Sequence, residues 1–454
     1  MTDAAERRAV RTRLHALSPL VRGGRTAVGL VVVLALAQLR AGPDTHLQLI
    51  TDAAAVGVAF VLGFVHWYVT WYSFDGTTLT VETGLLRRDV RSIPVARVQA
   101  IDVVQPAIGK MLSLSELRIR MAGAGKDERL AYLDHATAHA LRATLLARHH
   151  GVDAATPAPA APSYPVTPPG RLAAGIALSG PSAFLVLVVA AVASLWVADP
   201  PAGAQVARVG AAYLFGMVAA TWRRFNGEYG CEVSLAADGL RVRRGLVGTV
   251  SETIPRRRIQ AVRRVDPLAW RPWRWARLQV DLAGVVHRDE ASGPRGLTRV
   301  LVPVGTDDVV SALQRELVDP RRVELARPPR RARWKAPLSY RHLAAGFDER
   351  VAIATTGRLS KVTSWVPLEK VQSVRRVQGP VQRALGLASL HLDVAGRRAH
   401  AVFKDRDAAE VDGALDELVA HCRAARQTAP LVAPPRPVGS AARGQTWSGP
   451  ASIR

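Results

Sequence analysis

The chain has 454 residues, with 61 lysine and arginine residues against 37 aspartate and glutamate residues, so its formal net charge is +24 at pH 7. A chain of this length has room for about two to four domains. The positive charge favours an anionic partner, either a membrane surface or nucleic acid. Its two cysteines, Cys231 and Cys422, argue against a disulfide framework and against a cysteine metal site.

Four apolar stretches predict transmembrane helices, because a membrane-spanning helix needs about 20 mostly apolar residues. They cover residues 26–39, 53–72, 172–198 and 209–222. Gly180 and Pro181 predict a kink in the third stretch, because proline cannot donate a helical hydrogen bond.

Basic residues predict the orientation of these helices. Six arginines lie in residues 1–25, and Arg223 and Arg224 follow the fourth stretch directly. The connections at residues 42–47 and 199–205 contain neither lysine nor arginine. Because basic residues accumulate on the cytoplasmic side, we expect a four-pass plasma-membrane protein whose N-terminus, C-terminus and modules lie in the cytoplasm.

Two other interpretations of the stretches are weaker. The first stretch could be a cleaved signal peptide, since Ala35-Leu36-Ala37 resembles a cleavage site, but its basic leader is unusually long. The orientation would be the same in that case. All four stretches could instead be buried core helices, although core helices seldom lack polar residues over so many positions.

A short phrase occurs three times, at residues 94–100, 255–261 and 367–373. Each copy starts with proline, has a basic residue three positions later and a glutamine five positions later. A glycine stands ten residues before each proline, and a strand-like run begins 23 residues after it. This agreement predicts three copies of one module. The signature residues are Pro94, Arg97, Gln99, Pro255, Arg258, Gln260, Pro367, Lys370 and Gln372.

The residues around each phrase predict short antiparallel strands followed by one helix. In the first two copies, apolar residues alternate with polar ones between Asp-Gly and Gly, as in a hairpin. Helices are expected at residues 134–149, 307–317 and 405–422, each starting near an aspartate that suits an N-cap. After each proline, the basic residue and the glutamine are expected on one face of a strand.

The wording of the third copy resembles a known family. Residues 366–373 read Val-Pro-Leu-Glu-Lys-Val-Gln-Ser, and residues 380–388 read Pro-Val-Gln-Arg-Ala-Leu-Gly-Leu-Ala. They resemble the bacterial pleckstrin-homology-like (PH-like) domain of YdbS/YdbT-type membrane proteins. The first two copies keep Pro106 and Pro267 but lose Leu-Gly-Leu. For each copy the resemblance implies an α+β module, an antiparallel β-sandwich or barrel capped by a C-terminal helix, on the cytoplasmic face of the membrane.

The resulting expectation is a multi-domain membrane protein with four transmembrane α-helices and three PH-like modules. Its predicted order is a basic leader (1–25), transmembrane helices 1 and 2 (26–72), module 1 (73–150), a Pro/Ala-rich linker (151–170), transmembrane helices 3 and 4 (171–222), module 2 (223–319), a basic linker (320–337), module 3 (338–426) and a disordered tail (427–454).

The second module carries the candidate site for anionic lipid headgroups, because arginine pairs with phosphate and tryptophan suits the membrane interface. The candidate contacts are Arg256, Arg257, Arg258, Arg263, Arg264, Trp270, Arg271, Arg274 and Arg277. Trp273 and Trp275 align with leucines in the other copies and are expected in the core. The signature pair could line a ligand-binding face, or the glutamine could satisfy backbone groups near the strand end.

No pattern for catalysis, a metal or a cofactor stands out. His135 and His139 lack a glutamate between them, and Gly123–Lys126 lacks the other P-loop residues. Nucleic acid is disfavoured because no zinc-finger or helix-turn-helix pattern accompanies the arginines. We therefore expect a non-enzymatic membrane protein that binds anionic lipid headgroups, a protein partner, or both.

The alternative function is a component of a transport or envelope-export system that acts through its membrane helices. Asp52 and Arg208, at the outer ends of two stretches, are the residues that would matter for it. The apolar stretches otherwise contain few charges, which makes them a poor pathway for a polar substrate.

Overall fold

The computed structural model describes residues 12–13, 54, 57–58, 61, 64–65, 67–75, 78–84, 89–95, 98–121, 128–150, 163–236, 239–283, 288–289, 293–294, 298–318, 323–395 and 401–428. The basic leader (except for residues 12–13), the first apolar stretch, Asp52, most of the Pro/Ala-rich linker and the tail beyond residue 428 lie outside the described residues. So does Arg97 of the repeated phrase.

Each module consists of two antiparallel sheets and a helix, as predicted. The first sheet precedes the proline of the repeated phrase: β2 (Trp71–Phe74), β3 (Thr78–Thr83) and β4 (Asp89–Pro94) in module 1; β9 (Glu232–Ala236), β10 (Gly239–Arg244) and β11 (Thr249–Ile254) in module 2; β17 (Ala344–Phe347), β18 (Val351–Thr356) and β19 (Ser360–Pro367) in module 3.

The second sheet follows the proline, and a helix closes the module. These elements are β5 (Val98–Gln105), β6 (Leu114–Met121), β7 (Glu128–Asp134) and α4 (His135–His150) in module 1; β12 (Ile259–Pro267), β13 (Trp275–Leu282), β16 (Thr298–Thr306) and α8 (Asp307–Leu317) in module 2; β20 (Val371–Val377), β21 (Leu387–Val394), β22 (Ala401–Asp407) and α11 (Ala408–Thr428) in module 3.

The glycine ten residues before each proline forms the turn of a hairpin. Gly84, Gly245 and Gly357 have φ angles of 117°, 119° and 92°. Residues with a Cβ rarely adopt such angles. At Gly245 a Cβ would also lie 1.9 Å from the carbonyl oxygen of Gly248. The shared glycine is therefore a requirement of the backbone.

The repeated phrase itself is the corner between the two sheets. In modules 2 and 3 a short 3-10 turn, η2 (Arg256–Arg258) or η5 (Leu368–Lys370), follows the proline. In all three modules the strand pairing then shifts across the signature glutamine, between Val98 and Ala100, Ile259 and Ala261, and Val371 and Ser373. Such a bulge bends a strand and re-aims its side chains.

This corner corrects the prediction that the basic residue and the glutamine share a strand face. Arg258 and Lys370 lie in the 3-10 turns, and the glutamine is the extra residue of the bulge. Gln260 is buried, whereas Gln372 is exposed, so the shared glutamine has no common environment.

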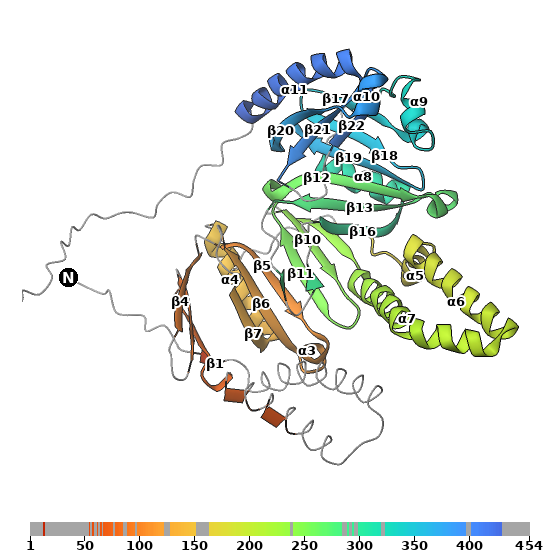
Figure 1. Cartoon of the computed structure of the whole chain (residues 1–454). Helices are drawn as coiled ribbons and strands as arrows, with labels where there is room; N and C mark the ends of the chain where they lie inside the picture. The colour runs from red at the N-terminus through yellow and green to blue at the C-terminus, as the bar shows by residue number, and fades with distance from the viewer. Residues whose placement is uncertain are drawn as a thin grey trace, which may run out of the picture.

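The modules are joined through their sheets. In sheet order, β7-β6-β5 of module 1 continues through β11-β10-β9 of module 2 into the short strand β8 (Ser163–Tyr164), and β16-β13-β12 of module 2 continues through β19-β18-β17 of module 3. The second sheet of one module and the first sheet of the next therefore form one continuous sheet (Figure 1). The two outermost sheets, β1-β2-β3-β4 (β1 being Thr12–Arg13) and β20-β21-β22, lie at opposite ends.

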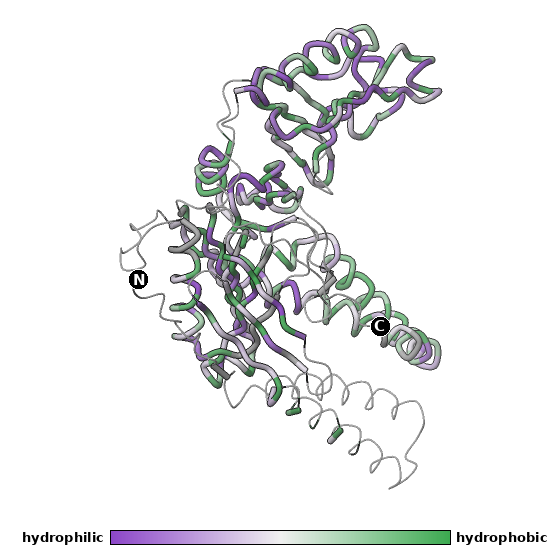
Figure 2. Tube along the Cα trace, turned by 90° about the vertical axis from the view of Figure 1, so that its left-hand side faces the viewer, coloured by the Kyte–Doolittle hydropathy of each residue, from purple (hydrophilic) through white to green (hydrophobic). Residues whose placement is uncertain are grey.

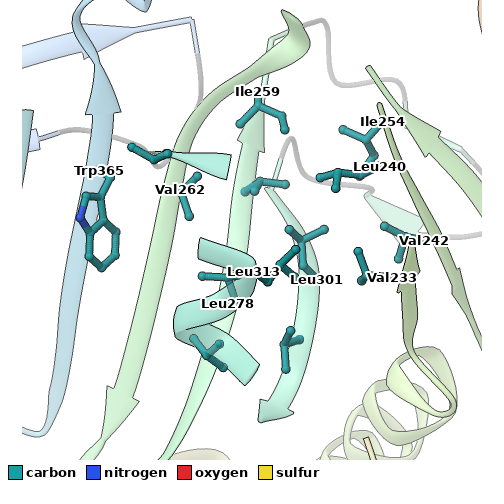
Figure 3. Packing of buried hydrophobic residues seen from close by; sticks show 14 of the residues in the cluster. Val233, Leu240, Val242, Ile254, Ile259, Val262, Leu278, Leu301, Leu313 and Trp365 are labelled. Carbon is teal, nitrogen blue, oxygen red and sulfur yellow. The ribbon is translucent and has the colours of Figure 1, made fainter. Parts of the chain in front are cut away.

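The core of module 2 lies between its two sheets. Figure 3 shows Val233, Leu240 and Val242 of the first sheet facing Leu278 and Leu301 of the second. Trp365 of β19 joins the same cluster, although it belongs to module 3. The junction is thus fastened by hydrogen bonds between strands and by a shared apolar core.

The basic segment between modules 2 and 3 is more than the predicted linker. Ala326 forms a bridge with Ala345 of β17, and residues Ala332–Lys335 form helix α9. Arg331 pairs with Asp407, the last residue of β22. The described part of this segment therefore belongs to module 3.

Three helices carry the third and fourth apolar stretches: α5 (Pro169–Ala177), α6 (Gly180–Ala198) and α7 (Pro200–Glu228). The break between α5 and α6 at Leu178 and Ser179 confirms the predicted kink. Helices α6 and α7 form a hairpin that projects from the modules (Figures 1 and 2). Among the helices of the described residues, α6 alone is long and apolar enough to cross a membrane, so the described part of the chain does not show the four predicted transmembrane helices.

Candidate membrane-facing surface

The helical hairpin exposes apolar side chains along both of its helices. Phe184, Leu187 and Val197 of α6 are 51–85% exposed, as are Tyr213 and Phe215 of α7 at 60% and 64%. Exposed apolar surface of this extent marks a membrane or protein contact. The 19 residues of α6 give a length of about 28 Å, close to the hydrocarbon thickness of a bilayer.

Module 2 is fixed to the base of this hairpin by Trp270. The Trp270 side chain is 1% exposed and packs with Leu172 and Ile176 of α5 and with Val304 of β16. Its Nε1–H donates to the carbonyl oxygen of Gly175 at 3.1 Å. Trp270 was predicted as a surface contact, and this prediction is wrong because α5 covers it.

Arg277 fastens the same base through an ion pair. Its two terminal nitrogens donate to the Glu228 carboxylate at 3.0 and 2.5 Å, and its side chain is 12% exposed. Glu228 ends α7, so this pair joins β13 to the hairpin. Arg277 is thus committed to a buried contact and does not face a ligand, contrary to the prediction.

Arg264 is likewise engaged within the module. It donates to Asp266 at 2.9 Å and to Asp307, the first residue of α8, at 2.6 Å. The hydrogen bond from Arg264 lowers the pKa of Asp307 and outweighs desolvation, which raises it. This group therefore anchors a helix start to a strand.

The arginines of the η2 turn lie far from the hairpin base. Arg256 and Arg257 are exposed, and Arg258 donates to the carbonyl oxygen of Ala283 at 2.9 Å. The nine residues of β12 separate this turn from Trp270, a distance of about 30 Å. Arg263, half-buried, lies on β12 between them. The predicted single patch is therefore divided between two ends of the module.

At the other end of β12, next to the hairpin base, basic and apolar residues lie together in the 3-10 segment η3 (Leu268–Trp273) and the residues next to it. We call Leu268, Arg271, Trp273, Arg274 and Leu359 the η3 surface. Arg271 donates to the carbonyl oxygen of Arg358 at 3.0 Å and Arg274 donates to Asp307 at 3.2 Å, yet the Arg274 side chain stays 78% exposed. Leu268, Trp273 and Leu359 are 50%, 52% and 72% exposed. The turn of the β18–β19 hairpin belongs to this surface because the Leu268 N–H donates to the Leu359 oxygen at 2.7 Å.

The exposure of Trp273 corrects its assignment to the core. Its ring stacks on Trp275 with centroids 5.4 Å apart. The aligned residues Leu112 and Leu385 are only half-buried, so side chains at this position are only partly covered in the other modules. The larger indole of Trp273 extends further into solvent than a leucine would.

A pocket of about 530 Å³ opens next to the η3 surface, in module 3. Gly357, which precedes Arg358 and Leu359, lines it together with Lys335, Lys404 and His391. Beside the pocket, Trp334 is 84% exposed and Leu338 is 68% exposed. The apolar and basic character of the η3 surface thus continues into module 3.

Polar side chains organise the floor of this pocket. The buried Asp405 accepts hydrogen bonds from Lys335 at 2.5 Å and from Gln382 at 2.7 Å, and its own N–H donates to the Ser389 hydroxyl at 3.1 Å. Asp405 offsets the charge of Lys335. The cation that the pocket offers to an anionic group is therefore the exposed Lys404.

These residues of module 3 were not among the candidate contacts predicted from the sequence. The triplet Arg333-Trp334-Lys335 lies in the segment interpreted as a linker, yet it combines tryptophan with two basic residues. That combination is the signal used for module 2. Within the described ranges, no group of three or more His, Cys, Asp or Glu side chains is placed to hold a metal ion.

Comparison with protein families gives one result that covers most of the chain. A family model described as Bacterial PH domain matches residues 26–149, 175–319 and 328–421. These three matches correspond to the three modules, the first two together with apolar residues that precede them. Comparisons with curated proteins and with solved structures gave no match.

We expect Trp270→Ala to destabilise the attachment of module 2 to the hairpin by about 3–5 kcal/mol, since a buried tryptophan is removed. Thermal unfolding of the detergent-solubilised full chain measures this effect. Trp273→Ala is the matched control and should cost much less, because its indole is half-exposed. Equal losses for the two variants would contradict the anchoring role.

We expect the Arg264–Asp307 pair to contribute stability above the ordinary pKa of aspartate, about 4, and to lose it as the pH falls through the lowered pKa of Asp307. Denaturant unfolding between pH 6 and pH 2.5 measures this. Asp307→Asn should be less stable at pH 6 and should lose less stability on acidification. An identical acid dependence in both proteins would contradict the assignment.

Proposed function

Because the chain belongs to the bacterial PH domain family, we propose that it is a non-enzymatic membrane protein whose modules are held against an anionic bilayer surface. The observation that carries this proposal is the position of the η3 surface at the base of an apolar helical hairpin. The hairpin supplies the anchor, and the η3 surface with its neighbouring pocket supplies the contact with headgroups.

The hairpin supports a membrane anchor in several respects. Its apolar side chains point outward, and α6 contains no charged residue. Trp196 near the tip and Trp222 near the base are 50% and 53% exposed, as interfacial tryptophans are. Arg223 and Arg224 follow Trp222 at the end of the hairpin that is next to the modules. Because basic residues accumulate on the cytoplasmic side of a membrane, they favour a cytoplasmic location for the modules.

The four-pass arrangement is the finer part of the proposal. The stretch at residues 53–72 is helical at the positions described between residues 54 and 68, and it leads directly into β2 of module 1. The predicted transmembrane helices 1 and 2 (residues 26–72) would anchor module 1 as α6 and α7 anchor module 2. All three modules would then lie on the cytoplasmic side of the plasma membrane.

The contact chemistry follows from the side chains of the η3 surface. Trp273, Leu268 and Leu359 suit the boundary between headgroups and acyl chains, while Arg271 and Arg274 suit phosphate. Each basic residue near an anionic leaflet is worth about 1 kcal/mol. Because the hairpin already tethers the modules, this affinity serves mainly to orient them. A protein partner can then bind the faces turned away from the membrane.

Spin labels in the full chain, reconstituted into bilayers, test the proposed orientation. Labels at Leu359 and Leu338 should be accessible to lipid-soluble oxygen in phosphatidylglycerol-containing bilayers, because these positions face the membrane. A label at Arg257 is the control and should stay accessible to aqueous quenchers, because η2 lies at the far end of β12.

Charge reversal separates lipid contact from simple tethering. The double variant Arg271→Glu and Arg274→Glu should lower the oxygen accessibility of the Leu359 label in anionic bilayers and leave it unchanged in neutral ones. Aqueous accessibility at Leu359 and Leu338 equal to that at Arg257, in anionic bilayers at low salt, would refute contact with lipid and favour protein binding.

A further inference from the structure

The two junctions between modules use the same pair of strands in the same register. In the first junction, Val103 and Val104 of β5 lie opposite Ser251 and Val250 of β11. In the second, Arg264 and Val265 of β12 lie opposite Thr363 and Val362 of β19. In both junctions, the residue nine positions after the proline of one module pairs with the residue four positions before the proline of the next module. The residue ten positions after the first proline likewise pairs with the residue five positions before the second. The junction is therefore part of the repeat.

The two strands that would make a third junction are at the ends of the chain. β20 is the equivalent of β5 and β12, and its neighbour among the described strands is β21. β4 is the equivalent of β11 and β19, and its neighbour among the described strands is β3. Within the described part of the chain, each strand therefore leaves unpaired the edge that its equivalents use for pairing.

Exposure of equivalent side chains shows the same difference. Val377 on β20, which also lines the pocket of module 3, is 39% exposed, whereas at the same position Val104 of β5 is 8% exposed and Val265 of β12 is half-buried. Val90 on β4 is 52% exposed, whereas at the same position Thr363 of β19 is 7% exposed and Ser251 of β11 is half-buried. An exposed edge that carries apolar residues is a site for adding a strand.

We propose that β4 of a second copy of this chain adds to β20 and makes a third junction between molecules. The internal register then places Ser92 opposite Val374, Arg91 opposite Arg375, Val90 opposite Arg376 and Asp89 opposite Val377. This contact is heterologous, because each copy offers one acceptor edge and one donor strand. Copies therefore assemble head to tail along the membrane, in a ring or an open row.

The pair of arginines in this register is tolerated for the reason seen in the first junction. There, the register continued by one residue places Asp102 opposite Glu252, and both carboxylates are buried. Arg299 compensates by donating to Glu252 at 3.0 Å. In the proposed junction each arginine has its own carboxylate, since Asp89 lies 3.1 Å from Arg91 and Asp393 lies 2.5 Å from Arg375.

Module 1 shows that a module helix and an added strand can lie on the same sheet. Helix α11 packs on β20, and Asp412 of α11 pairs with Arg376 at 2.7 Å. In module 1 the equivalent helix α4 packs on β5, and its Arg142 donates to Thr253 of β11 at 2.8 Å. A helix over this sheet thus contacts the incoming strand without blocking it.

Disulfide trapping in reconstituted bilayers tests the register directly. Full-length Ser92→Cys and full-length Val374→Cys, prepared separately, mixed and oxidised, should give a cross-linked dimer that neither protein gives alone. Ser92→Cys with Val377→Cys is the matched control and should give several-fold less, because cysteines more than about 7 Å apart between Cα atoms cannot be bridged. The native Cys231 and Cys422 are buried, and the unsubstituted protein gives the background.

A second pair of cysteine positions and a change of one charge show whether a low yield comes from a misfolded variant. Val90→Cys with Arg376→Cys should cross-link as Ser92→Cys with Val374→Cys does. Arg91→Glu, which sets a carboxylate opposite Arg375, should raise the yield of the first pair by up to about fivefold. The proposal is overturned if both in-register pairs give only background, or if the Val377→Cys control gives an equal yield. Background yields would point to another occupant of β20, such as a different protein.

Discussion

The arrangement of this molecule depends on one structural constraint: each module is completed by strands of its neighbour. A bulged corner at the repeated proline sends the chain from one sheet to another, and the second sheet then ends in an edge at β5 or β12. That edge is covered by the first sheet of the next module, and Trp365 shows that the apolar core crosses the same boundary. Since the pairing in each junction is fixed by register, the modules are held in one relative orientation.

This constraint gives the hairpin its significance. Trp270 and the Arg277–Glu228 pair join module 2 to the base of α6 and α7, and module 2 lies between the other two modules in the row of sheets. An anchor at this single place therefore orients all three modules. The η3 surface and the pocket in module 3 lie side by side because β12 and β19 share a sheet. Contact with the bilayer on this side would leave the other end of β12, with Arg256 and Arg257, for a partner.

Much of the fold followed from the sequence because backbone requirements leave a mark in it. The hairpins that end in Gly84 and Gly245 and the helix near each aspartate have local causes, so they were predicted. The corner at each proline was not predicted, because the phrase was interpreted as the start of a regular strand. The candidate site followed less well. Its arginines were grouped because they are close in sequence, whereas β12 carries them to opposite ends. Trp270 was expected outside, although Gly109 and Gln382, at the same position of the other modules, are buried. The junctions could not be predicted, because strand edges pair over long distances in the chain.

Hydrogen exchange of the backbone amides tests the continuous sheets most directly. In the detergent-solubilised full chain, peptides that contain Thr249–Ile254 and Ser360–Pro367 should be protected to the same degree as Trp275–Leu282 in the centre of module 2. Both strands are paired on their two sides, and alternate amides face the two neighbouring strands, so the amides of β11 and β19 that face β5 and β12 open only when the junction opens. Exchange of these junction-facing amides as fast as that of loop residues, with the amides that face β10 and β18 still protected, would contradict the account, because the modules would then be separate bodies joined only by the chain.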